Sequence, residues 1–154
     1  MTGNAPARLL ATWFGTGLAP KAPGTWGSIA ALPFAWLIQS WGGSAALVLA
    51  ASLLLLAGWA ASDRLVTATG IKDPQIIVVD EVVGQWLTLA CGPVTIPAYL
   101  VGLLLFRAAD ITKPYPASWA DRRVGGGLGV MLDDVLAALY SGLGLWLVDR
   151  VIGL

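Results

Sequence analysis

Long apolar stretches alternate with short polar ones along this chain, and five apolar segments stand out. They run from about Trp26 to Trp41, Ser44 to Ser62, Gln75 to Cys91, Pro97 to Ile111 and Leu128 to Val148. A full transmembrane helix needs about 20 apolar residues, so the shorter first and fourth segments require tilt, bilayer thinning or partial insertion. The pattern predicts an all-α integral membrane bundle of about five apolar helices, some short or tilted, forming a single membrane-embedded domain over residues 1–154.

The connections between these segments differ in charge. The first, Gln39–Gly43, and the third, Gly92–Ile96, contain no charged residue. The N-terminal stretch and the second and fourth connections hold Arg8, Lys21, Asp63, Arg64, Lys72, Asp73, Lys113, Asp121, Arg122 and Arg123. Alternate connections lie on the same side of a membrane, and Lys and Arg mark the cytoplasmic side. We therefore expect a multi-pass protein whose charged loops share the cytoplasmic face.

The composition agrees with a membrane protein and excludes several kinds of chemistry. Hydrophobic residues make up 57% of the 154 residues and charged residues 12%, whereas soluble domains average about 45–50% and about 25%. The formal net charge is zero, and the chain has no basic run, which argues against nucleic acid as a partner. The absence of His and the single Cys, Cys91, exclude His-based catalysis, His–metal sites and an intrachain disulfide.

Three groups of ionisable residues lie inside the apolar segments rather than in the connections. They are Asp80 with Glu81 in the third segment, Arg107 with Asp110 in the fourth, and Asp133 with Asp134 in the fifth. Charges within membrane spans are costly, so they usually face the bundle interior and mark function. Each group lies near the predicted cytoplasmic end of its helix, and we expect the groups to converge there.

Helical spacing supports this convergence. Glu81, Gln85 and Thr88 fall on one stripe of a helix, and Asp134, Ala138 and Ser141 fall on another. Arg107 and Asp110 share a face with Lys113. Paired carboxylates without His or thiolate suit a hard cation such as Mg²⁺. The predicted metal ligands are Asp80, Glu81, Asp133 and Asp134, with Asp110 close by.

Two other interpretations of these charges remain open. The acids could form structural salt bridges with Arg107, Lys113, Arg122 and Arg123. Alternatively, a small cation transporter or channel could use the same carboxylates, although charges gathered at one face do not form a path across a membrane.

Two glycine-rich stretches flank the charged segments. Pro23–Ser28 precedes the first segment, where Thr25 or Ser28 could cap a helix or donate to a phosphate oxygen. Gly125–Gly129 lies between Arg122–Arg123 and Asp133–Asp134, so a flexible loop there could close on a phosphate.

Four blocks of sequence, in order, resemble the phosphatidylglycerophosphatase A family. They are Ala22–Ser28, Asp80–Trp86, Phe106–Pro114 and Gly126–Val135, and the resemblance extends from about Ala11 to Leu147. It implies a compact helical bundle in the bacterial inner membrane that requires Mg²⁺ and hydrolyses phosphatidylglycerophosphate to phosphatidylglycerol and phosphate. One departure is Ala109, where the family pattern leads us to expect an aromatic residue before Asp110.

The resemblance and the residue pattern lead to one assignment of roles. Asp80, Glu81, Asp133, Asp134 and Asp110 form the expected catalytic group, and the expected phosphate-binding residues are Arg107, Lys113, Arg122, Arg123, Thr25 and Ser28. The lipid headgroup reaches the site at the membrane surface while the acyl chains stay in the bilayer. We expect attack by activated water rather than by an aspartate nucleophile. The division of the acids between metal binding and base, the number of ions and the oligomeric state stay open at this point.

Overall fold

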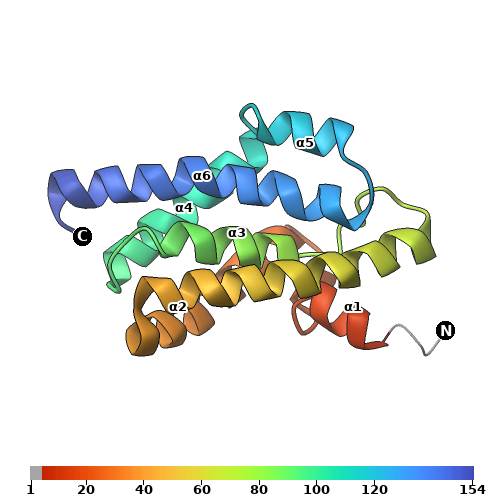
Figure 1. Ribbon diagram of the computed structural model, residues 1–154, viewed down its shortest axis with the longest axis horizontal. Coiled ribbons are helices and arrows are strands. Elements are labelled where there is room, and N and C mark those ends of the chain that lie inside the picture. The colour runs from red at the N-terminus through yellow and green to blue at the C-terminus, as the bar shows by residue number, and fades with distance from the viewer. Residues whose placement is uncertain (1–4) are drawn as a thin grey trace.

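The computed structural model describes residues 5–154, and that part of the chain is helical without any strand (Figure 1). The helices are α1 (Ala5–Ala11), the 3₁₀ helix η2 (Thr16–Leu18), α2 (Pro23–Thr69), α3 (Val79–Leu89), α4 (Ile96–Thr112), α5 (Ala117–Arg123) and α6 (Gly126–Ile152). The predicted all-α class is confirmed. Two of these helices, α2 and α6, are long and apolar enough to cross a membrane, judged by length and composition.

Helix α2 consists of two helical segments that meet at Gly43. This residue has φ 70° and ψ −175°, a backbone region that is essentially restricted to glycine. Ala31 and Ala35 before the kink share a buried cluster with Leu47 and Ala51 after it. The two segments therefore form a hairpin, which corresponds to the first two predicted apolar segments and their uncharged connection (Figure 1).

Helix α3 is shorter than the sequence predicts. It begins at Val79 instead of Gln75 and has 11 residues, about 16 Å of helix against a hydrocarbon core of about 30 Å. The Ile77 N–H donates to the Pro74 carbonyl, and the Val78 N–H donates to the carbonyl of Ala11. Because these bonds hold residues before α3 in a turn against α1, Asp80 and Glu81 lie in the first turn of α3 rather than inside it.

Two short helices occupy stretches that the apolar pattern predicts to be connections. Helix α1 lies in the N-terminal stretch, and α5 lies between α4 and α6. Helix α5 buries Ala117 and Ala120 and packs on α6. A single helical turn or two with a narrow apolar face leaves little periodic signal, which is why the pattern did not predict them.

Helix α3 lies in the middle of the bundle, in contact with α2, α4 and α6 (Figure 1). Nine of its 11 residues are buried. A side chain at Gly84 would overlap the ring of Phe106 and lie 3.0 Å from the carbonyl oxygen of Asp134. The glycine thus lets α4 and α6 approach α3 closely. The predicted stripes face each other, with Thr88 Oγ1 and Ser141 Oγ 2.7 Å apart.

The two ends of the bundle differ in their polar residues. At the far end, where Gly43 and Gly92 lie, Gln39 Nε2 donates to Ser44 Oγ at 3.1 Å and to the carbonyls of Leu89 at 3.3 Å and Gly92 at 3.0 Å. Tyr99 donates its hydroxyl to Gln39 Oε1 at 2.8 Å. This network ties α2 to α3 and α4. The opposite end, where α2 and α6 begin, holds every charged residue of the described chain except Asp149 and Arg150, and we call it the charged end.

Removing one hydrogen bond from the Gln39 network should lower the stability of the protein without impairing its function. Tyr99→Phe leaves a buried amide oxygen without a donor, so the free energy of unfolding should fall by about 1–2 kcal/mol. Denaturant titration in micelles, followed by tryptophan fluorescence, measures the change. Tyr115→Phe is the matched control, because Tyr115 is 72% exposed. Equal stability of the two variants would contradict a stabilising role for this network.

Candidate active site

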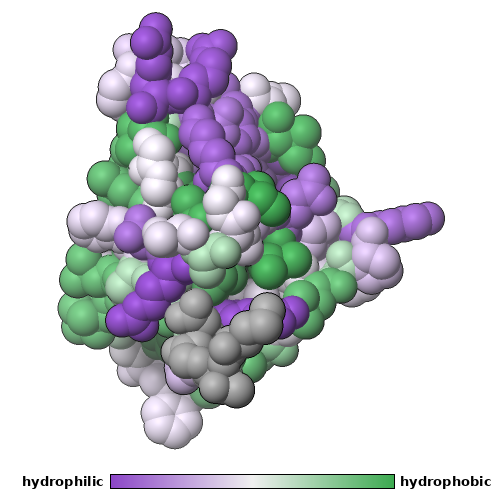
Figure 2. Space-filling view, turned by 90° about the vertical axis from the view of Figure 1, so that its right-hand side faces the viewer, coloured by the Kyte–Doolittle hydropathy of each residue, from purple (hydrophilic) through white to green (hydrophobic). Residues whose placement is uncertain are grey.

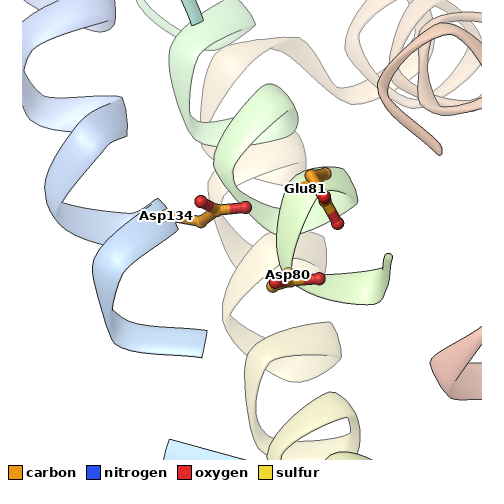
Figure 3. Close-up of side chains that lie close together, drawn as sticks. All are labelled: Asp80, Glu81 and Asp134. Atoms are coloured by element: carbon orange, nitrogen blue, oxygen red, sulfur yellow. The ribbon is translucent and has the colours of Figure 1, made fainter. Parts of the chain in front are cut away.

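Three carboxylates converge at the charged end, where α3 meets α6. Asp80 and Glu81 come from the first turn of α3, and Asp134 comes from the third turn of α6. Each offers an oxygen within 4.8 Å of the others, and Figure 3 shows the Asp134 side chain extending from α6 toward α3. Asp80 is 8% exposed and Asp134 is 2% exposed. The positive end of the α3 dipole favours negative charge at this position.

One oxygen of each of these carboxylates lacks a hydrogen-bond partner. Asp80 Oδ1, Glu81 Oε2 and Asp134 Oδ2 are buried and accept no bond from any described residue. Burial of several unpaired anionic oxygens is costly unless a cation or donor compensates them. An all-oxygen donor set matches the preference of hard divalent cations such as Mg²⁺. Asp80, Glu81 and Asp134 thus fit a metal site.

Arg107 and Asp110 form an ion pair beside this carboxylate group. Arg107 Nη1 donates to Asp110 Oδ2 and lies 3.9 Å from Glu81 Oε1. The Nε of Arg107 is buried and has no acceptor among residues 5–154. The guanidinium therefore has a donor available for a further acceptor.

Lys113 occupies the position after α4 and joins two acids. Its Nζ lies 2.8 Å from Asp121 Oδ1 and 2.6 Å from Asp133 Oδ2. Burial lowers the pKa of Lys113, but the hydrogen bonds to Asp121 and Asp133 outweigh this effect and raise the pKa above its ordinary value. Lys113 is consequently a fixed positive charge at neutral pH and a poor proton donor. Asp133 pairs with this lysine, whereas each of the other three predicted metal ligands keeps one oxygen without a hydrogen-bond partner.

These side chains surround a cavity of about 670 Å³. Its acidic lining residues are Asp73, Asp80, Glu81, Asp110, Asp121, Asp133 and Asp134, and its basic lining residues are Lys72, Arg107, Lys113 and Arg122. The acids outnumber the bases by three. Figure 2, which faces the charged end, shows hydrophilic side chains gathered there among apolar ones.

The start of α2 forms one wall of the cavity, and its backbone lies very close to two charged side chains. Ala22, Pro23 and Gly24 line it. A Cβ atom at Gly24 would overlap the Glu81 carboxylate and lie 3.2 Å from Arg107 Nη1. Only the absence of a side chain at Gly24 allows this wall to contact both residues.

Hydrogen bonds from Lys72 and from the start of α6 hold other parts of the cavity together. Lys72 Nζ donates to the carbonyls of Asp121 at 2.6 Å and Arg122 at 3.3 Å, at the end of α5. The Gly127 N–H donates to Asp63 Oδ1 at 3.0 Å, which anchors the start of α6 to α2. Burial raises the pKa of Asp73, and the neighbouring Lys113 partly opposes this shift. Asp73 therefore takes up a proton more readily than an exposed aspartate.

The structure brings together eight of the eleven residues predicted for the site. The cavity is lined by Asp80, Glu81, Asp110, Asp133, Asp134, Arg107, Lys113 and Arg122, whereas Arg123, Thr25 and Ser28 are not part of its lining. Ser28 is buried, and its hydroxyl donates to the Gly24 carbonyl at 3.0 Å. Lys72, Asp73 and Asp121 also line the cavity. From the sequence these three are only loop charges, because helical periodicity carries no information about where a loop folds.

The fold and the site define an apolar helical bundle with a mixed acidic and basic cavity at one end, an arrangement suited to phosphoryl chemistry. The sequence model of the family described as phosphatidylglycerophosphatase A matches residues 9–149, and the chain belongs to this family. Its members are phosphatases, and this chain is an enzyme of phospholipid metabolism.

Two relatives illustrate the similarity. The chain is 38% identical over 137 residues to phosphatidylglycerophosphatase A of Escherichia coli K12, an alignment that covers 88% of this chain and 79% of that protein. It is also 38% identical over 137 residues to the Haemophilus influenzae protein of the same name, with 88% and 84% covered. No solved structure matches the chain.

Because the backbone at Gly24 lies so close to Glu81, adding one methyl group there should strongly reduce activity. Gly24→Ala should displace the Glu81 carboxylate and lower phosphatase activity about tenfold or more, since small misplacements in a site cost up to about 10² in rate. Gly125→Ala is the control, because open space surrounds a Cβ there. Phosphate release and the thermal midpoint are measured for both variants. Full activity of Gly24→Ala would show that this wall does not constrain Glu81.

Proposed function

We propose that this chain hydrolyses the terminal phosphomonoester of phosphatidylglycerophosphate, releasing phosphatidylglycerol and phosphate, with Mg²⁺ as cofactor. The observation that carries this proposal is the group of three carboxylates beside Arg107 and Lys113, each with one buried oxygen that lacks a hydrogen-bond partner. The shared name of the Escherichia coli and Haemophilus influenzae relatives supports the substrate. None of the comparisons supports the alternative of an ion transporter or channel.

The charge balance of the cavity supports a requirement for a cation. Seven acidic lining residues face four basic ones, so a phosphomonoester dianion would meet an excess of negative charge. Asp80, Glu81 and Asp134 would hold Mg²⁺, which neutralises charge, polarises the phosphoryl group and activates water when bound. Asp133, which the sequence also assigned to the metal, instead accepts a hydrogen bond from Lys113.

The chain's own residues position the phosphate. We assign Arg107 to the non-bridging oxygens, because its Nε donor is free and its planar fork suits a phosphate. Lys113 supplies a second positive charge, and Arg122 a third on the cavity lining. Asp110 and Asp133 orient Arg107 and Lys113 through the ion pairs described above. One carboxylate of the group of three accepts the proton of the attacking water and returns it to the glycerol oxygen as the bond between that oxygen and phosphorus breaks.

We also propose that residues 1–154 work as one multi-pass domain of the bacterial inner membrane, with the cavity on the cytoplasmic face. Lys and Arg are concentrated at the charged end, and the turns at Gly43 and Gly92 carry no charge. This asymmetry follows the preference of Lys and Arg for the cytoplasmic side.

Neutralising the unpaired carboxylates should abolish catalysis. We expect Asp80→Asn and Asp134→Asn each to lower Mg²⁺-dependent phosphate release from phosphatidylglycerophosphate in mixed micelles by about 10²-fold or more, since each removes an anionic ligand. The same preparations are assayed after chelation and after return of Mg²⁺.

Asp149→Asn at the far end is the matched control and should retain full activity. Both site variants should elute as the same folded species as the unaltered protein. Near-normal activity of both Asp80→Asn and Asp134→Asn would refute the metal assignment, and release of phosphate that is indifferent to chelation would refute the cation requirement.

The proposed membrane orientation predicts which positions a reagent outside the cell can reach. In a chain with Cys91→Ser, a cysteine at Tyr115 should resist a membrane-impermeant thiol reagent in intact cells, because Tyr115 lies at the charged end. A cysteine at Trp41 should react, because Trp41 lies at the far end and is 88% exposed. The reverse pattern would invert the proposed topology.

A further inference from the structure

An apolar groove lies beside the start of α2, outside the cavity. It has a volume of about 410 Å³ and is formed by residues of the η2 region together with Trp26, Ile29 and Ala30 of α2. Leu18 and Trp26 are 51% and 53% exposed there. The groove contains no charged residue. It thus offers an open, concave apolar surface.

The groove and the cavity share one short stretch of chain. Ala22, Pro23 and Gly24 line the cavity, while Ala19 and Trp26 on either side of them line the groove. Ala30 is six residues beyond Gly24, about 9 Å further along the helix axis and away from the charged end. A molecule that spans both sites would therefore pass from the charged end toward the apolar middle of the bundle.

A positive charge lies on the stretch between the two sites. Lys21 is exposed, and its side chain takes part in none of the ion pairs found within residues 5–154. In the proposed substrate, phosphatidylglycerophosphate, a phosphodiester lies between the terminal phosphomonoester and the acyl chains. The order of features along this surface, from acidic–basic cavity to lysine to apolar groove, complements the order of groups in such a lipid.

We propose that the groove binds an acyl chain of the phospholipid whose phosphomonoester enters the cavity. This inference rests on the proposed function and adds a binding site for the apolar part of the substrate. The groove would hold the lipid at the depth and direction at which its headgroup reaches Arg107 and Lys113. Acyl-chain contacts in the groove would then contribute to apparent substrate affinity, whereas chemistry at the phosphate would not depend on them.

The test compares a long-chain with a short-chain substrate. Ala30→Phe fills the groove, and Trp26→Ala removes one of its walls. For dipalmitoyl phosphatidylglycerophosphate, each should lower kcat/KM at least about fivefold, mainly through KM. For the dihexanoyl lipid, kcat/KM should stay within about twofold of the unaltered protein. Ala57→Phe, at an exposed position of α2 outside the groove, is the matched control and should change neither value.

Equal effects of a groove variant on both substrates would indicate general damage to the protein and overturn the groove assignment. The same effect from Ala57→Phe would indicate ordinary contact with the bilayer and overturn it as well. A second measurement uses phosphatidylglycerol with a photoreactive acyl chain in micelles. The label should appear on the peptide that contains residues 15–30 and decrease several-fold in Ala30→Phe but not in Ala57→Phe. If the unaltered protein hydrolyses neither substrate, the proposed function fails, and the labelling pattern alone decides whether the groove binds an acyl chain.

Discussion

The close approach of three carboxylates, each with one buried oxygen that lacks a hydrogen-bond partner, is the constraint on which the rest of this structure depends. Asp80, Glu81 and Asp134 would repel one another in an apolar bundle unless other parts of the protein compensated them. The start of α3 supplies a favourable dipole, and Arg107 lies at the edge of the group. At the far end, which holds no buried carboxylate of the described residues, the Gln39 network ties α2 to α3 and α4.

Close helix packing brings these carboxylates together, and small residues make the packing possible. Gly84 lets α3 approach α4 and α6, and Gly24 lets the start of α2 touch Glu81 and Arg107. Gly127 similarly allows α6 to approach the backbone of α2 near Asp63. A methyl group at any of these positions would separate elements whose side chains must meet. The site therefore depends on backbone contacts as much as on its charged residues.

The charged end combines two surfaces of opposite character that share one stretch of chain. The cavity holds acidic and basic side chains, and the groove beside it is apolar. This juxtaposition suits an amphipathic substrate better than a soluble phosphate ester, because each part of a lipid finds a surface of its own polarity. Ion pairs of Asp110 with Arg107 and of Asp133 with Lys113 hold the basic side chains on the cavity lining.

The sequence by itself determined the helical class, the hairpin of the first two segments and the convergence of Asp80, Glu81 and Asp134, because these follow from apolar length and helical spacing. Only the tertiary structure decided that Asp133 pairs with Lys113, that α3 begins at Val79, and that Lys72, Asp73 and Asp121 join the cavity. The reason is physical. Periodicity describes which face of one helix is apolar, whereas ion pairing and loop placement depend on contacts between residues that are distant along the chain.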